Sequence, residues 1–124
     1  MLWVSYGKFS REGIQGLIDH PQDRADAIQQ LMNAYHGKLV SYHLLLNGEI
    51  DFFIVADIPD EKVVDLNLVN ALLVRGSGSV ESITTVPAYR AEDAIPLMRR
   101  AQKMKSDQTY KAPAAYGYFP REGA

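Results

Sequence analysis

The chain has 124 residues, of which 13 are Lys or Arg and 15 are Asp or Glu, so its formal net charge is -2. This length predicts one domain with a sizeable core, and the absence of cysteine excludes disulfides, thiolate metal sites and a cysteine nucleophile. The charge gives no general attraction for nucleic acid or anionic membranes, and no apolar run reaches the roughly 20 residues of a membrane-spanning helix. Because no signal-like leader opens the chain, we expect a cytoplasmic protein that binds neither nucleic acid nor membrane.

The first third of the chain predicts one strand followed by two helical segments. Residues 2–9 alternate in polarity and include β-favouring side chains, which is typical of a strand. Ser10 is placed to cap a helix, and Pro21 interrupts the apolar spacing before a second helical segment resumes. Gly37 is expected to end that second helix.

A hairpin is predicted at the centre of the chain, with strands over residues 38–46 and 51–58. Asn47 and Gly48 lie between the two apolar runs, and Asn-Gly favours a type I′ turn, in which both central residues have positive φ. The second strand is apolar at nearly every position. Such a strand needs cover on both faces.

The second half of the chain predicts a helix, a strand and a last helix. The first helix opens at Pro59, the strand spans residues 79–89, and the amphipathic last helix spans residues 91–105. Residues 106–124 show no periodicity and predict an extended or flexible tail. The domain is therefore expected to span residues 1–105.

The element order strand, helix, strand, strand, helix, strand predicts the α+β class. It is typical of a ferredoxin-like βαββαβ fold, a four-stranded antiparallel sheet with helices on one face, here followed by a C-terminal helix. Phe52 and Ile54 would lie on one side of the third strand and Phe53 and Val55 on the other, so the face without helices would expose an apolar patch. We expect a homodimer, or a dimer of dimers, in which two such faces close a barrel.

A set of residues within positions 1–95 matches the pattern of one protein family. These are an aromatic first strand and Ser10, Gly13, Ile14, Pro21, Arg24, Gly37, Lys38, Tyr42, Gly48, Asp51, Phe52, Pro59 and Asp60. The chain thus resembles the GYD domain family of the dimeric α+β barrel superfamily, with Ile50 where the family tends to have the tyrosine of its naming triplet. Superfamily relatives include cofactor-independent monooxygenases, haem-handling enzymes and stress-responsive proteins. The resemblance implies the fold more strongly than a function.

Two ionisable side chains of the hairpin are candidate catalytic residues. Asp51 follows the turn and could accept a proton at the mouth of a cleft, or instead bind backbone amides of the turn. His43 could act as a base or orient a substrate, or be a structural histidine; haem ligation by it would follow only from the superfamily analogy. The spacing of His20, His36 and His43 lacks the helical i, i+4 pairing of a zinc motif, so we predict no metal site and no cofactor.

Four strand side chains are candidate ligand contacts. Trp3, Tyr6, Tyr42 and Thr84 could line a pocket for a small apolar or aromatic ligand, although strand aromatics also pack in cores and dimer interfaces. Two functions stay open. The first is a small-molecule-binding protein, either a ligand sensor or a cofactor-independent oxygenase-like or isomerase-like enzyme. The second is a non-catalytic homodimeric interaction or structural module, whose interior would be filled.

Overall fold

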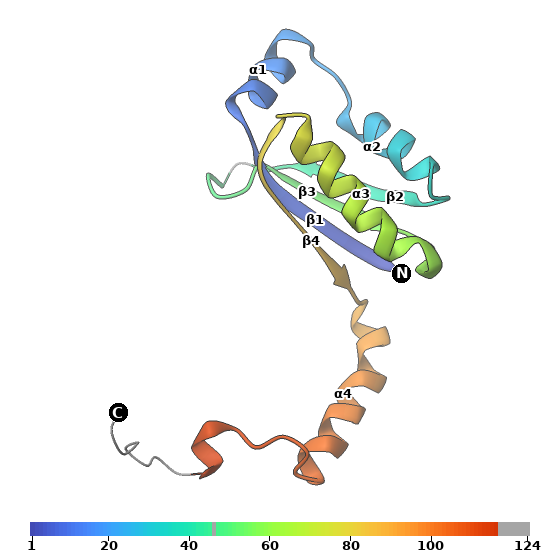
Figure 1. The fold of residues 1–124 in the computed structure, drawn as a ribbon, viewed down its shortest axis with the longest axis vertical. Helices are drawn as coiled ribbons and strands as arrows, with labels where there is room; N and C mark the ends of the chain where they lie inside the picture. The colour runs from blue at the N-terminus through green and yellow to red at the C-terminus, as the bar shows by residue number, and fades with distance from the viewer. Residues whose placement is uncertain (46, 117–124) are drawn as a thin grey trace. The chain divides into compact units, whose positions relative to one another are not determined.

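The computed structural model describes residues 1–45 and 47–116 of the chain. The chain divides into two units, Met1–Ala88 and Tyr89–Ala124 (Figure 1). The first unit contains the sheet and three α-helices, and the second contains the helix α4.

The first unit confirms the predicted order of strands and helices. Its four strands pair antiparallel throughout, in the order β2-β3-β1-β4, which is the ferredoxin-like α+β arrangement. The strands are β1 (Leu2–Phe9), β2 (Lys38–Leu44), β3 (Phe52–Asp57) and β4 (Val80–Ala88). The helices are α1 (Arg11–Asp19), α2 (Arg24–Asn33), the short 3-10 helix η1 (Asp60–Lys62) and α3 (Val63–Gly76).

The starts of α1 and α2 follow from capping side chains. The hydroxyl of Ser10 accepts a hydrogen bond from the backbone N–H of Gly13 at 3.0 Å, as predicted. The Asp23 carboxylate accepts one from Ala25 N at 2.9 Å and so caps α2. Each cap satisfies a donor that the first helical turn leaves unpaired. Pro21 lies between the two helices, which confirms the predicted break.

The end of α2 differs from the prediction. His36, and not Gly37, takes the left-handed backbone conformation, with φ of 57°. Gly37 is buried, and a Cβ atom there would come no closer than 3.4 Å to the carbonyl oxygen of Asp57, which is an ordinary van der Waals contact. Its N–H donates to Met32 O at 3.0 Å, which closes the end of the helix.

The predicted type I′ turn is wrong. Gly48 does have a positive φ of 79°, but the backbone N–H of Leu45 donates to the carbonyl of Asp51 at 2.9 Å, so the last paired residues are 45 and 51, and not 46 and 49 as a two-residue type I′ turn requires. The side-chain oxygen of Asn47 accepts hydrogen bonds from the N–H groups of Glu49 at 2.9 Å and Ile50 at 2.8 Å. Asn47 therefore organises a loop longer than two residues, and the predicted strand end at Leu46 lies outside the described residues.

A one-residue shift changes which side chains of β2 share a face. Leu39 pairs with Ala56, but Ser41 pairs with Val55, so the register of β2 against β3 slips between these two pairs. Strict alternation would have placed Leu39 on the same face as His43. The shift instead places Leu39 and His43 on opposite faces of the sheet. This is the effect of a β-bulge, which interrupts the alternation of side chains along a strand.

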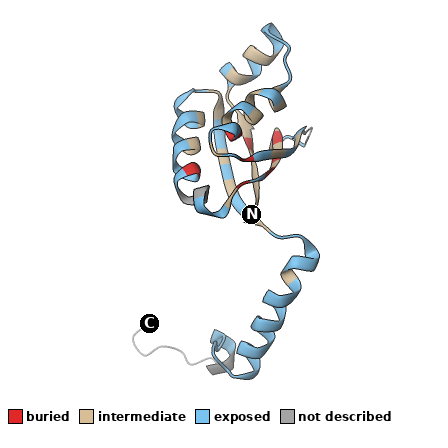
Figure 2. Ribbon diagram, turned by 90° about the vertical axis from the view of Figure 1, so that its right-hand side faces the viewer, coloured by how far each residue is buried: buried red, intermediate tan, exposed pale blue. Residues whose placement is uncertain are grey.

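The helices α2 and α3 pack on one face of the sheet. A buried cluster joins Met32 of α2, Leu66 of α3, Ala56 of β3 and the neighbouring Ile58, with Trp3 packed against it. Figure 2 shows that the buried residues belong to the first unit, whereas α4 is exposed along almost its whole length. The opposite sheet face carries partly exposed apolar side chains: Val4, Tyr6, Phe53, Val55 and Val86.

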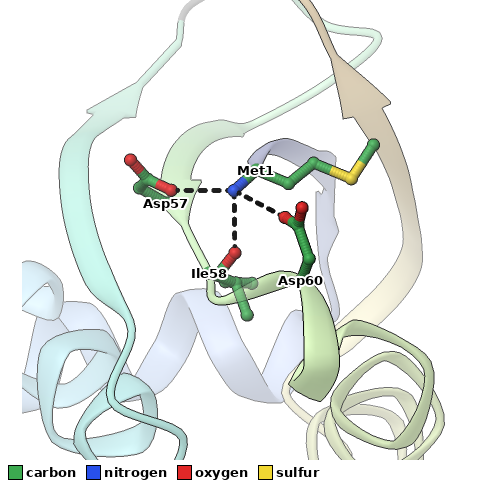
Figure 3. A network of polar contacts seen from close by, with 4 residues as sticks. All are labelled: Met1, Asp57, Ile58 and Asp60. Carbon is green, nitrogen blue, oxygen red and sulfur yellow. Dashed lines mark hydrogen bonds and ion pairs between the residues drawn. The ribbon is translucent and has the colours of Figure 1, made fainter.

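Ion pairs and a hydrogen bond join Met1 to the residues at the end of β3 (Figure 3). The Met1 ammonium lies 3.1 Å from a carboxylate oxygen of Asp57 and 3.2 Å from one of Asp60, and donates to the carbonyl of Ile58 at 2.8 Å. The hydrogen bond to Asp57 raises the pKa of the ammonium, and Asp60 acts in the same direction against the effect of burial. The ammonium therefore stays protonated at neutral pH and ties β1 to the junction that leads into α3.

The second unit contains α4 (Ala91–Ser106) and the 3-10 helix η2 (Pro113–Tyr116). Lys103 and Asp107 form an ion pair of 3.0 Å at the end of α4. Among the described helices, none is long and apolar enough to cross a membrane. Part of the predicted tail, residues 117–124, lies outside the described residues, and the predicted extents 1–105 and 106–124 stay predictions.

Candidate functional site

Two adjoining cavities lie between the sheet and the helices α2 and α3. They measure about 250 and about 300 Å³. The side chains that line both cavities are all apolar: Ile28, Leu31, Ile54, Val74 and Ile83. Because they share this wall, we treat the two cavities as one site and call it the hollow. The first cavity extends to Trp3 and Asn70, and the second extends to Arg24 and Tyr42.

Two buried polar atoms in the first cavity have no hydrogen-bond partner among the described residues. One is the indole nitrogen Nε1 of Trp3, a donor, and the other is the side-chain oxygen Oδ1 of Asn70, an acceptor. Nearly all buried polar groups in folded proteins are paired, so each exception needs an explanation. Here a donor and an acceptor are both left over in the lining of one cavity.

The hydroxyls of Ser5 and Thr85 behave differently, although both line the same cavity. They lie on the neighbouring strands β1 and β4, directly opposite each other. Their oxygens are 2.8 Å apart and form a hydrogen bond. This pair is satisfied within the sheet, which leaves Trp3 and Asn70 as the unpaired groups there.

The second cavity combines a cation with a phenol. Burial raises the pKa of the Tyr42 hydroxyl, and the nearby Arg24 guanidinium opposes that effect. Tyr42 is therefore a neutral hydrogen-bond donor at physiological pH. A guanidinium nitrogen of Arg24 also donates to the side-chain oxygen of Gln22 at 2.9 Å.

The structure divides the predicted ligand contacts between the two sheet faces. Trp3 and Tyr42 line the hollow. Tyr6 and Thr84 lie on the opposite face, where they pair in register with each other and with Phe53 and His43, so these four residues form one row across all four strands.

Asp51 lies near the end of β1, away from that row. One of its carboxylate oxygens accepts a hydrogen bond from Phe9 N at 2.9 Å, and its own N–H donates to the carbonyl of Gly7 at 2.7 Å. The backbone groups that Asp51 binds thus belong to β1, and not to the turn as considered from the sequence. Neither hydrogen bond nor ion pair joins the described side chains of Asp51 and His43, and their shared catalytic role stays a prediction.

Several polar side chains of the hollow were not predicted as site residues, among them Asn70, Arg24 and Arg75. Asn70 lies four positions after the buried Leu66, on the apolar face of α3. A polar residue at the spacing of core residues was the available signal that Asn70 could be a site residue. Arg24 belongs to the family pattern but, like Arg75, had no comparable signal as a site residue, because an arginine at a helix end is ordinarily solvated. Only the packing of α2 and α3 on the sheet places them beside the cavities.

The described residues contain no group of three or more His, Cys, Asp or Glu side chains placed to hold a metal ion. No curated protein matches the chain. The family model for the GYD domain matches residues 3–98, which include all of the sheet except Leu2 and every helix that lines the hollow. The match spans most of the chain, and the chain therefore belongs to the GYD domain family.

Proposed function

We propose that this chain binds a small molecule in the hollow, either as a ligand sensor or as a cofactor-independent oxygenase-like or isomerase-like enzyme. The observation that carries the proposal is the unpaired donor of Trp3 and the unpaired acceptor of Asn70 in one apolar cavity. A small molecule that offers one acceptor and one donor would satisfy both. Pockets of this kind, mostly apolar with a few placed polar groups, are typical ligand sites.

The two unpaired groups are costly to the free protein, which favours a ligand that pairs with them. An unpaired buried polar group costs about 1–3 kcal/mol, so two of them take a sizeable part of the about 5–15 kcal/mol by which domains are stable. A filled interior, as expected for a purely structural module, would not leave this space next to such groups. Tyr42 in the adjoining cavity adds a further polar contact for a ligand.

Replacing Asn70 by leucine should stabilise the ligand-free protein. Asn70→Leu removes a buried acceptor without a partner and keeps a side chain of similar size, so the free energy of unfolding should rise by about 1–3 kcal/mol. Urea unfolding followed by circular dichroism would measure the change. The same variant should lose the thermal shift produced by any metabolite that stabilises the wild-type protein in a library screen.

The matched control is Asn67→Leu, since Asn67 lines the same cavity but is exposed. That substitution should change stability by less than about 0.5 kcal/mol. A loss of stability in Asn70→Leu would mean that the Asn70 oxygen has a partner inside the protein. The proposal would then lose the observation on which it rests.

A second observation supports the proposed homodimer. The same dimer is also expected under the alternative function, a non-catalytic interaction or structural module. The sheet face opposite the hollow carries Val4, Tyr6, Phe53 and Val55. The core helices described for the first unit, α2 and α3, pack on the other face. Two such faces packed together would bury about 1,200–2,000 Å² in a stable interface and close a barrel. A dimer of dimers is compatible with the same contact.

Light scattering at micromolar concentration should therefore give a dimer or a tetramer. Val55→Lys places a charge on the proposed interface and should shift the protein to monomer, whereas Gln30→Lys on the exposed side of α2 should not. Both variants should still unfold cooperatively. A monomeric wild-type protein at micromolar concentration would contradict the dimer.

A further inference from the structure

The charges around the hollow are all of one sign. Arg75 lines the first cavity and Arg24 lines the second, and the described lining residues of both cavities include neither Asp nor Glu. Neither arginine takes part in an ion pair within residues 1–45 and 47–116. The whole chain is net negative, so this excess of positive charge is local to the hollow.

We infer that the ligand of the hollow is an amphipathic carboxylate, whose charged group binds Arg24 and Tyr42 and whose body fills the apolar wall. The inference rests on the proposed small-molecule function and adds the chemical class of the ligand. An uncharged ligand would leave a partly buried guanidinium without a counter-charge, which is unfavourable in a site of low polarity.

The chemistry of Arg24 and Tyr42 suits a carboxylate. A guanidinium presents five N–H donors in a planar fork, and the bond from Arg24 to Gln22 uses one nitrogen of that fork. The Tyr42 hydroxyl, kept neutral because burial raises its pKa, can donate one further hydrogen bond. Together they offer charge and two directed donors to the two oxygens of one carboxylate.

The shape of the site sets the rest of the ligand. Between the Arg24 end and the Trp3 end the shared lining is aliphatic, with Ile28, Ile54 and Ile83 on three different elements. An unbranched or cyclic hydrocarbon body fits this wall, and the unpaired groups of Trp3 and Asn70 accept a polar substituent further along it.

The test compares octanoate with octanamide, which have nearly the same shape but differ in charge. Trp3 is the single tryptophan of the chain and lines the hollow, so its fluorescence reports filling of the site directly. Octanoate should bind at least about tenfold more tightly than octanamide to the wild-type protein, as expected for charge-assisted hydrogen bonds. Its affinity should fall as salt is added.

Substitutions then assign the charge effect to Arg24. Arg24→Gln should weaken octanoate about tenfold and leave octanamide within about twofold, whereas Arg24→Lys should retain part of the preference for the carboxylate. Arg11→Gln is the matched control, because Arg11 is exposed on α1 and does not line the hollow. If Arg24→Gln fails to fold, Tyr42→Phe removes the other donor assigned to the carboxylate and should weaken octanoate more than octanamide.

The outcomes separate the two proposals. Equal affinity for octanoate and octanamide, unchanged in Arg24→Gln, would overturn the carboxylate class and still support small-molecule binding in the hollow. No response of Trp3 fluorescence to either probe would overturn the inference as well. A destabilised Asn70→Leu, by contrast, would count against the proposed function whatever these probes do.

Discussion

Replacing Gly7 by alanine should destabilise the protein by about 3 kcal/mol or more, because the added methyl group meets backbone that cannot move aside. Gly7 is buried in β1, next to β4. A Cβ atom there would collide with the carbonyl oxygen of Ser82, and would lie 2.8 Å from the Ser82 carbonyl carbon and 2.9 Å from the Cα atom of Ile83. Relief requires that the two strands separate.

Gly16→Ala is the control for this substitution. Gly16 lies in α1 with no heavy atom within 4 Å of the position of an added Cβ, so alanine there should be neutral or stabilise the helix by up to about 1 kcal/mol. Both variants would be unfolded with urea. Equal stabilities of Gly7→Ala and wild type would show that β1 and β4 are not held at this distance in solution.

Most of the fold could be predicted from the sequence because its signals are local. The β1 alternation, the Ser10 cap and the break at Pro21 depend on residues within a few positions of each other, and the structure confirms each of them. The turn was mispredicted since Asn-Gly fits more than one loop. Asn47 can supply a side-chain acceptor as well as tolerate positive φ, and here it supplies the acceptor.

The register of β2 against β3 could not be predicted from the sequence, for a different reason. Alternation sets the more apolar side chains Val40, Tyr42 and Leu44 against Leu39, Ser41 and His43. The structure places Leu39 on the same face as Tyr42 and Leu44, because the register slips between Leu39 and Ser41, and strict alternation does not predict that slip. This slip decides that Tyr42, and not His43, faces the hollow.

The candidate site was only partly predictable because it is assembled from distant segments. Trp3 and Tyr42 were identified as strand aromatics, but their partners Asn70 and Arg24 lie on two different helices. Whether these side chains meet depends on how α2 and α3 pack on the sheet. That packing depends on contacts between distant parts of the chain, and the spacing of residues within one helix or strand does not predict it.

The alternation of β1 lets the two proposals be tested separately. Trp3 and Ser5 line the hollow, whereas Val4 and Tyr6 lie on the opposite face, where the dimer is proposed. Substitution at Val4 or Tyr6 should therefore change the oligomeric state before it changes ligand binding. Substitution at Trp3 should do the reverse.

Replacing Leu66 by alanine should cost about 2–5 kcal/mol of stability, the range measured when a fully buried leucine is truncated. Leu66 is 1% exposed, lies at the centre of the buried cluster and joins α3 to Met32, Ala56 and Ile58. The truncation removes apolar contacts and leaves a larger space, because the sheet and α2 hold the surrounding side chains in place. Urea unfolding of the ligand-free protein would measure the loss.

Leu72→Ala is the matched control, since Leu72 lies on the same helix but is 65% exposed, and its truncation should cost less than about 0.5 kcal/mol. The same pair of variants also tests the role of the hollow, because Leu66 lines its first cavity and Leu72 does not line either cavity. If a carboxylate fills the hollow, Leu66→Ala should shift the preference from octanoate towards a longer chain such as decanoate, while Leu72→Ala should leave it unchanged. A loss of stability without any change in chain-length preference would place the bound ligand outside the hollow.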